Sequence, residues 1–485
     1  MPRYELVEGT SSKFWEIEQA RGDSYTVRWG RIGSAGQTQL KKLSAAQHQK
    51  LVDEKLRKGY SLAGGATKSK GKSKAKPAAA APAKAKPAAS NPGLEATLYE
   101  AIDDAERWLV YADWLQQQGD VRGELITLNL RKKKPAAKKL AAANVDALWG
   151  DAKRLLDEDY FSQLTYKPTW SKQPLPLEVS FMHTLGKEGL VESITITGLD
   201  EDGHVAKALH DLLTAPIGRF VRSINIEAAN GESYTGASGQ PNAGAAIAAI
   251  ARAKPTALRS VSLGSSGYQL SWTYTGNLGP LWKAAPHLEH ISIDMGNVEL
   301  GKQIDLPRLR SLVIATGGLD RKNLLAIGKA KWPALEELTL FLGCTDYGGN
   351  AKRADLVTLL ANPAHFPKLK SLAICNAEIQ GDVVREVVKS SLVKQLETLD
   401  LSKGTLVDEQ VEPIVQNMAL LKKLKRLDLS ENYLTDGFER TLRKALGKTF
   451  VGGDSRYEEM LEERGDAGDA TWARHETFRY TVVGE

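Results

Sequence analysis

Nine short segments of the chain share one arrangement of apolar residues, which recur at the first, fourth and sixth positions of each segment. The clearest of them begins the stretch LKRLDLSENYL, from Leu424 to Leu434, in which Asn432 follows the third apolar residue. The alternating triplet at 427–429 predicts a short strand, and Asn432 is placed to hydrogen-bond backbone groups where the chain bends. A single unit of this kind cannot bury its apolar side alone, so neighbouring units are expected.

The eight upstream segments begin at Val191, Val221, Leu258, Leu288, Leu309, Leu335, Leu369 and Leu396. Their spacing runs from 21 to 37 residues, and the longest step contains a Gly/Ser/Asn-rich insertion at 230–244. Helical return segments are predicted at 204–213, 245–253, 321–331, 354–360, 382–389, 408–418 and 436–446. We interpret residues 191–450 as an α/β solenoid, with parallel strands on its concave side and helices on its convex side, followed by a C-terminal cap at 451–485.

Units of this length, with helix-containing returns and the sequences LVDEQ and LTDGF after the last two strands, resemble the ribonuclease-inhibitor-like class of leucine-rich repeat. That resemblance implies a curved scaffold that binds another protein. The residue that precedes each strand is charged, and its sign alternates over the last six repeats. Because equivalent positions of stacked parallel strands become lateral neighbours, we expect Glu397 to lie between Lys370 and Lys425.

The outward positions of the strands would line the concave face, where small and polar residues predominate. The charged and large apolar residues there are the candidates for contacts with a protein partner: Glu227, Asp294, Glu337, Phe341, Asp400, Arg426 and Asp428. Five of the seven are acidic, which predicts a partner that is locally basic or neutral. Phe341 is the candidate for a buried anchor, and packing against the loop at 343–350 is the alternative role for this ring.

A different pattern occupies residues 1–65, where apolar and polar residues alternate at 4–7, 13–19 and 24–32 and helical spacing follows at 44–58. These patterns predict a small antiparallel sheet and a helix. The run RWGRIG at 28–33, with the strand FWEIEQ before it and the helix ending EKLRKGY after it, resembles the WGR domain of DNA-dependent poly(ADP-ribose) polymerases and bacterial regulators. The resemblance implies nucleic-acid binding. It does not imply polymerase activity, because no ADP-ribosyl transferase region follows this module.

Seven residues of the module are candidates for nucleic-acid contacts: Trp29, Gly30, Arg31, Lys41, Lys42, Arg57 and Lys58. Trp29 can stack on an exposed base or sugar, Arg31 can hold a phosphate with two donors, and Gly30 lets backbone N–H groups approach an anion. The other four would add a sequence-independent attraction. The alternative is that Trp29 belongs to the core and Arg31 is a solvated charge at the sheet edge.

Charge is distributed unevenly along the chain. Residues 1–93 carry 18 basic and 7 acidic side chains, a net charge of +11, so the net +6 of the whole chain leaves about −5 for the remainder. We therefore expect the N-terminal part to meet any polyanion. Residues 66–93, with seven lysines, four prolines and ten alanines, predict a flexible linker that acts as a spacer or also follows a phosphate backbone.

Residues 94–190 are predicted to be mainly helical. The run RWLVYADWLQQQGDVRGELITL at 107–128 resembles the short repeat-companion domain that precedes repeats in many bacterial proteins, a family with no attached chemistry. A basic break at 131–139 is predicted to precede a further helix at 145–157, which would cap the first repeat.

The sequence offers no catalytic constellation. HExxH, GxSxG and paired-cysteine motifs are lacking, and the GKT at 447–449 lacks the glycine that a phosphate-binding loop needs five residues earlier. Cys344 and Cys375 are too few for a disulfide framework, and no 18-residue apolar span occurs. We expect no enzyme activity, no cofactor, no metal and no membrane association, and a cytoplasmic location.

These features predict a monomeric, non-enzymatic adaptor that binds nucleic acid, with DNA favoured over RNA, through the WGR module and an unidentified protein through the repeats. One alternative is a pure protein–protein interaction scaffold. The other is a regulatory subunit of a nucleic-acid-processing or ADP-ribosylating enzyme, supported by the association of WGR modules with polymerases.

Overall fold

The computed structural model describes residues 3–8, 11–21, 24–31, 37–42, 51, 55, 61–62, 88–166, 173–200, 202–228, 241–265, 270–458, 460–461 and 479–483. The chain separates into two compact units, Met1–Lys84 (unit 1) and Ala85–Glu485 (unit 2). Each unit has a hydrophobic core of its own.

Unit 1 contains the predicted antiparallel sheet. Its strands are β1 (Arg3–Glu8), β2 (Ser11–Arg21), β3 (Ser24–Arg31), β4 (Gln37–Lys42) and β5 (Ser61–Leu62), in the order β4-β3-β2-β1-β5. Alternate residues of β2 and β3 bury Trp15, Ile17, Tyr25 and Val27 together, as the period of two along a strand requires. Of the helix predicted at 44–58, only Leu51 and Lys55 lie within the described residues.

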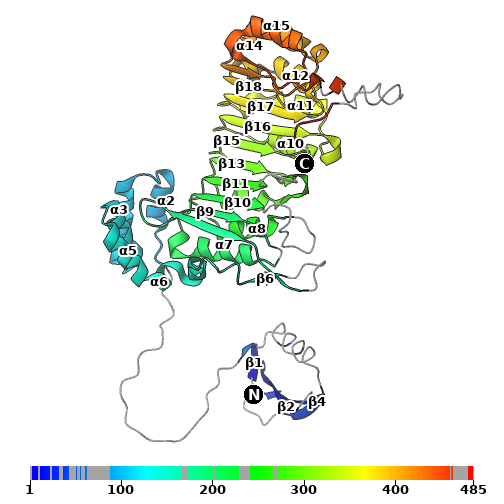
Figure 1. Ribbon diagram of the computed structural model, residues 1–485. Helices are drawn as coiled ribbons and strands as arrows, with labels where there is room; N and C mark the ends of the chain where they lie inside the picture. Colours follow the sequence, from blue (N-terminus) through cyan, green and yellow to red (C-terminus); the bar gives the residue numbers. More distant parts are fainter. Residues whose placement is uncertain are drawn as a thin grey trace, which may run out of the picture. The chain divides into compact units, whose positions relative to one another are not determined.

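Unit 2 is built on one 11-stranded sheet, in the order β20-β19-β18-β17-β16-β15-β13-β11-β10-β9-β8 (Figure 1). All nine predicted strands are confirmed, and each pairs in parallel with the next. They are β9 (Val191–Thr197), β10 (Ser223–Ala228), β11 (Ser260–Ser265), β13 (His290–Asp294), β15 (Ser311–Ala315), β16 (Glu337–Gly343), β17 (Ser371–Ala377), β18 (Thr398–Asp400) and β19 (Arg426–Asp428). Two edge strands were not predicted: the antiparallel β8 (Ser180–Leu185) beside β9, and β20 (Phe450–Val451) beside β19.

The expected register is confirmed at the start of these strands. The backbone N–H of Glu397 donates to the carbonyl of Lys370 over 2.7 Å, and the N–H of Lys425 donates to the carbonyl of Glu397 over 2.7 Å. The ammonium of Lys425 also lies 2.5 Å from the carboxylate of Glu397. Glu397 is therefore the lateral neighbour of both lysines.

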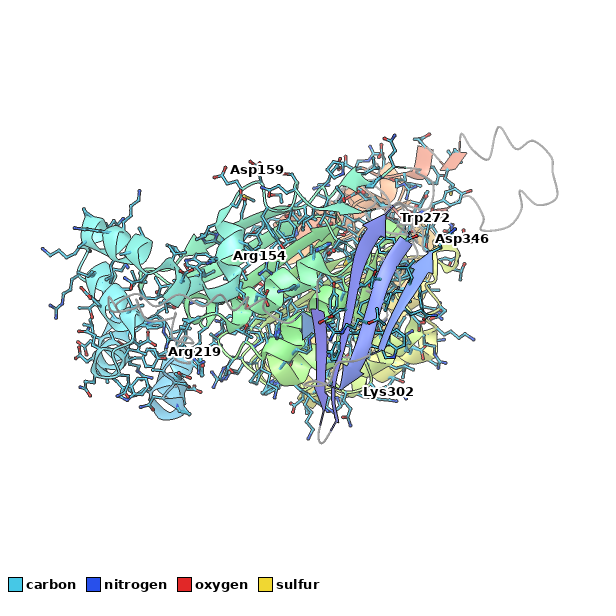
Figure 2. All side chains as sticks on the ribbon, turned by 90° about the horizontal axis from the view of Figure 1, so that it is seen from below. Arg154, Asp159, Arg219, Trp272, Lys302 and Asp346 are labelled. Carbon is cyan, nitrogen blue, oxygen red and sulfur yellow. The ribbon has the colours of Figure 1, made fainter. Side chains whose placement is uncertain are left out.

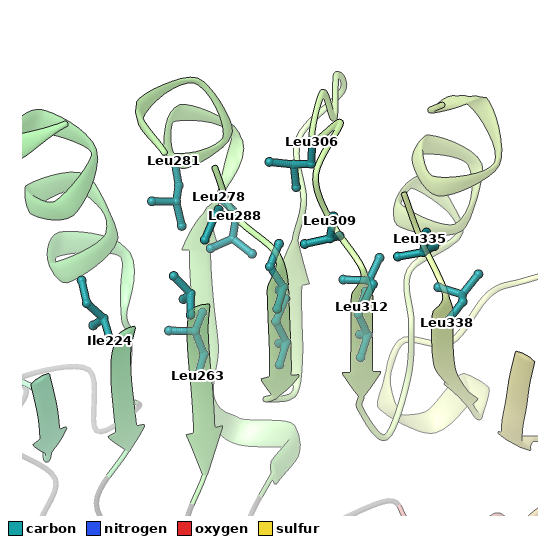
Figure 3. Close-up of a cluster of buried hydrophobic side chains, with 14 of the residues drawn as sticks. Ile224, Leu263, Leu278, Leu281, Leu288, Leu306, Leu309, Leu312, Leu335 and Leu338 are labelled. Atoms are coloured by element: carbon teal, nitrogen blue, oxygen red, sulfur yellow. The ribbon is translucent and has the colours of Figure 1, made fainter. Parts of the chain in front are cut away.

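Helices lie along one face of this sheet (Figure 1). They are α7 (His204–Thr214), α8 (Gly244–Ala253), α9 (Gly279–Ala284), α10 (Arg321–Lys329), α11 (Arg353–Leu360), α12 (Gln380–Lys389), α13 (Glu412–Gln416), α14 (Met418–Leu421) and α15 (Asp436–Leu446). Leucines of the strands and of the return segments meet between the two layers (Figure 3). The sheet face opposite the helices, called the open face below, carries the small and polar residues of each strand.

Three return segments differ from the prediction, and one of them is the return between β11 and β13, where α9 was not predicted. The helix expected at 408–418 is replaced by a 3-10 turn, α13 and α14. The α-helix begins only at Glu412, because Pro413 lacks the backbone N–H and fits only the first turn of a helix. Between β13 and β15 the return contains the strand β14 (Asn297–Glu299), which pairs with β12 (Tyr274–Asn277) in a separate small sheet. A third sheet joins β6 (Thr165–Tyr166) to β7 (Leu175–Pro176).

The segment before the array is more helical than predicted. It contains α2 (Pro92–Glu100), α3 (Ala105–Gln117), α4 (Val121–Leu130), α5 (Lys134–Ala143), α6 (Val145–Trp149) and a 3-10 helix (Gly150–Leu156). The predicted break at 131–139 is confirmed only at 131–133, and from Lys134 onward it is wrong, because lysine and alanine are strong helix formers and Ala137 anchors α5 in the core. The linker predicted to extend to 93 ends earlier, since the backbone N–H of Ala89 donates to Asp120 and Arg122 donates to the carbonyl of Ala89.

Candidate functional site

Trp29 is the central candidate of unit 1 and lies on β3, directly opposite Trp15 of β2. Its half-buried side chain packs against the cluster of Trp15, Ile17, Tyr25 and Val27. The ring therefore stabilises the core of unit 1, and its exposed part is what could meet a ligand.

The other face of β3 carries Arg28. Its guanidinium lies 3.6 Å from the carboxylate of Glu16 and 5.5 Å from the centre of the Phe14 ring. Phe14 and Glu16 are both buried. Arg28 thus has structural contacts, which the sequence pattern did not indicate.

The two predicted lysines lie on β4, an outer strand of the sheet in the part of unit 1 that the structure describes. Lys41 is paired with Tyr25, whose face of the sheet also carries Trp29. Lys42, one residue on, is exposed and lies on the opposite face. The structure brings Trp29 and Lys41 to one face and separates Lys42 from them.

The remaining candidates of unit 1 are less completely described. Gly30 pairs with Phe14, and Arg31 ends β3 opposite Lys13. The side chain of Arg31 and the whole of Arg57 and Lys58 lie outside the described residues.

All seven candidates for protein contacts lie on the open face of unit 2, but their exposure differs. Asp294 and Glu337 are exposed, whereas Glu227, Phe341 and Asp400 are half-buried. The carboxylate of Glu227 accepts a hydrogen bond from Asn225 over 2.8 Å, and that of Asp400 accepts one from the N–H of Ser402 over 2.9 Å.

Asp428 does not fit the predicted role. It is only 4% exposed, and it accepts hydrogen bonds from the N–H of Ser430 over 2.9 Å and from Arg426 over 2.5 Å. Arg426 and Asp428 neutralise each other because they lie two residues apart on the same side of β19. The acidic character of the open face therefore comes from the other four carboxylates.

Charged groups missed by the sequence prediction gather where helix α2 meets the array. Glu95, which is buried, accepts hydrogen bonds from Tyr111 over 2.9 Å and from Arg219 over 2.7 Å. Figure 2 shows Arg219 beside the helices that precede the array. Burial alone would raise the pKa of Glu95, but the hydrogen bond and charge of Arg219 outweigh it, so the pKa is lowered.

A second buried acid, Glu188, lies 2.7 Å from Arg222, which also holds Glu192 at 2.7 Å. Burial raises the pKa of Glu188, and the positive charge of Arg222 offsets only part of this effect. These groups join one element to another in unit 2. Their role is structural. The sequence does not indicate these pairs, because only the fold brings the acidic and basic partners together.

No constellation for catalysis is found among the described residues. Cys375 is buried, its thiol donates to the carbonyl of Asp400 over 3.5 Å, and burial raises its pKa well above the usual value. Within the described ranges, no three His, Cys, Asp or Glu side chains come together as a metal site. No helix in those ranges is long and apolar enough to cross a membrane.

Comparisons with known proteins bear mainly on unit 1. The curated proteins give no match. A crystal structure of a Bacteroides fragilis protein, a target of the Northeast Structural Genomics Consortium, is 21% identical, with 94% of this chain and 96% of that chain covered and a TM-score of 0.47. Residues 3–67 match the WGR domain family, so the chain contains a WGR domain that begins with β1 and includes β5.

Proposed function

We propose that the chain is a non-enzymatic adaptor that binds nucleic acid, DNA in preference to RNA, through its WGR domain and a protein through the open face of unit 2. The match of residues 3–67 to the WGR family, whose members often bind nucleic acid, carries the first half of this proposal. The net charge of +11 on residues 1–93 supports it, because phosphate binding is driven by local positive charge.

Trp29 and Lys41 would form the contact surface of the WGR domain. They lie on the same face of the sheet, but Lys41 is four residues further along β4 than Gln37, the partner of Trp29, so an aromatic edge and an ammonium would meet different points of one sugar-phosphate backbone. Lys42 would act from the opposite face through its long-range field only.

We assign the repeating units of unit 2 to the ribonuclease-inhibitor-like leucine-rich repeats. Asn432 supports this assignment, because it is buried at the bend after β19 and bonds four backbone groups. Its amide donates to the carbonyls of Leu401, Leu429 and Ser430, and its carbonyl accepts from the N–H of Leu406. Repeats of this class present a continuous sheet face to protein partners.

The open face would receive a locally basic or neutral protein segment. Asp294, Glu337 and Asp400 supply accessible carboxylates, and Phe341 lies among small residues, opposite Cys375 of the next strand. Once a partner is found, Phe341→Ala combined with Asp400→Lys should weaken binding at least about tenfold, roughly 1.4 kcal/mol. An unchanged affinity would place the partner elsewhere on unit 2.

The nucleic-acid half is tested by fluorescence anisotropy with a labelled duplex of about 20 base pairs, offered as DNA and as RNA. The double variant Lys41→Gln/Lys42→Gln should weaken DNA binding several-fold without unfolding unit 1, because both side chains lie on an outer strand. The matched control is Lys138→Gln/Lys139→Gln on α5, two exposed lysines of a basic run in unit 2. Equal losses in both variants would contradict a WGR-specific site.

The alternative of a pure protein–protein scaffold makes the opposite prediction in the same assay. A scaffold of that kind would show no binding of either duplex at moderate salt, and neither pair of lysine substitutions would matter. The role of regulatory subunit would require that an enzyme copurify with the chain.

A further inference from the structure

Residues 479–483 cross the ends of three successive strands of unit 2. The backbone N–H of Val483 donates to the side-chain carbonyl of Asn376 over 2.8 Å, and the amide of Asn376 donates to the carbonyl of Val483 over 2.7 Å. The N–H of Val482 donates to the backbone carbonyl of Lys403 over 3.3 Å. One buried side chain therefore pairs with both backbone groups of one residue.

Tyr433 holds the other end of this segment in a similar way. Its hydroxyl accepts a hydrogen bond from the N–H of Tyr480 over 2.8 Å and donates one to the carbonyl of Tyr480 over 3.2 Å. The guanidinium of Arg456 donates to the same carbonyl over 2.5 Å and lies 5.0 Å from the centre of the Tyr433 ring. Arg479 donates to the carbonyl of Thr405 over 2.9 Å.

The surface under the segment is rigidly built. Asn376 and Tyr433 are 0% and 1% exposed, so their polar groups are fixed by the packing around them. Asn376, near the end of β17, and Lys403 and Glu431, after β18 and β19, occupy equivalent positions and share a positive φ of 51°, 64° and 54°. Asn376 and Lys403 donate their own N–H groups to the next repeat, and Glu431 donates to Gly453 after β20, so successive units fix one another at this edge.

Most of these contacts are made with the backbone of the segment, and the exception is the guanidinium of Arg479, which donates to the carbonyl of Thr405. Tyr480 and Val482 leave 51% and 37% of their surface exposed. Recognition of a peptide through its N–H and C=O groups, with its side chains largely free, allows a surface to bind peptides of varied sequence.

We propose that the surface formed by Asn376, Lys403, Thr405, Tyr433 and Arg456 is a binding site for an extended peptide. The resident ligand is the chain's own segment 479–483, and an extended segment of a protein partner replaces it. This site lies at the carboxyl ends of the strands, apart from the open face, and it does not depend on the proposed function.

The resident segment is covalently connected to the surface that it occupies, and this connection favours it over a peptide of a protein partner. A tethered ligand has an effective concentration in the millimolar range, so a free peptide at micromolar concentration cannot displace it efficiently. Binding in trans should appear once the resident segment is weakened.

The test uses the full chain and a fluorescein-labelled peptide with the sequence of residues 476–485, ETFRYTVVGE. The variant Val482→Pro/Val483→Pro removes two of the three backbone N–H groups that hold the resident segment, whereas Val482→Ala/Val483→Ala keeps all three. Anisotropy should show the peptide binding the proline variant at least about tenfold more tightly than the wild-type chain or the alanine variant. No gain in the proline variant would overturn the proposal.

Two further measurements test the site itself. In the proline variant, Tyr433→Phe removes the hydroxyl and keeps the ring under Arg456, so peptide affinity should fall about tenfold while the thermal unfolding curve stays in place. A peptide with serine at the positions of Tyr480 and Val482 should bind within about threefold of the original. An unaffected Tyr433→Phe variant, or loss of binding by the serine peptide, would contradict backbone recognition at this surface.

Discussion

Units 1 and 2 use their charged side chains in different ways. Residues 1–84 carry 17 basic and 7 acidic side chains, whereas residues 85–485 carry 48 and 52. In unit 2 the charges face one another, as in the pairs Glu95–Arg219 and Glu188–Arg222 between packed elements. Charged side chains of unit 2 are neutralised by neighbouring side chains of opposite sign. The excess of positive charge that could attract a polyanion lies in unit 1.

The largest effect is expected from Arg222→Ala, because it leaves Glu188 buried at 0% exposure without its cation. Breaking a buried ion pair on one side costs about 3–5 kcal/mol. The matched control is Arg310→Ala, which occupies the equivalent position before β15 and holds Glu336 in an exposed pair. Urea denaturation should show a larger loss of unfolding free energy for Arg222→Ala than for Arg310→Ala. Equal losses would show that burial does not make an ion pair of unit 2 more important for stability.

A smaller loss is expected from Asn432→Ala. Removing this buried amide leaves the N–H of Leu406 and the carbonyl of Leu401 without a partner, which costs about 1–3 kcal/mol. Asn417→Ala serves as control, because Asn417 is half-buried and its amide bonds the carbonyl of Pro413 alone. If both variants unfold at the same urea concentration, the hydrogen bonds of the buried amide at this bend do not contribute to the stability of unit 2.

The pair Glu95–Arg219 should make the stability of unit 2 depend on pH in the acid range. The folded-state pKa of Glu95 is lowered, so its contribution is fully present above the unfolded-state pKa and is lost as pH falls through the folded-state pKa. The free energy of unfolding of the wild-type chain should therefore exceed that of Glu95→Gln by an amount that is constant near neutral pH and shrinks below about pH 4.5. A difference independent of pH would mean that Glu95 acts through packing only.

The smallest effect is expected from Lys425→Ala. The side chain of its partner Glu397 is 41% exposed, and the hydrogen bond and charge of Lys425 lower the pKa of Glu397. Pairs of this kind are screened by salt and by water. The denaturation midpoint should stay within experimental error, and a clear shift would indicate that the exposed pairs also hold the register.

The sequence predicted the array well because its signal is local. Every strand from β9 to β19 in the main sheet repeats the same apolar spacing, and the alternating charges predicted that Glu397 neighbours Lys370 and Lys425. The edge strand β8 lacks the repeated spacing, and α5 was missed because its six neighbouring basic residues were interpreted as a break.

The functional surfaces were harder to predict because they depend on tertiary contacts. The half-burial of Trp29 results from its position opposite Trp15, and the neutralisation of Asp428 results from the side chain of Arg426. The pairing of Val483 with Asn376 joins residues 107 positions apart through backbone groups. The pattern of side chains along the sequence does not indicate such a contact.

The measurement that tests the account most directly is the salt dependence of DNA binding by the full chain. The logarithm of the binding constant should fall linearly with the logarithm of salt concentration, and Lys41→Gln/Lys42→Gln should lower the slope by about 0.9 for each phosphate that these lysines neutralise. The control Lys138→Gln/Lys139→Gln on α5 should leave the slope unchanged. A binding constant that does not respond to salt, or a slope that changes only in the α5 variant, would contradict the assignment of nucleic-acid binding to the WGR domain.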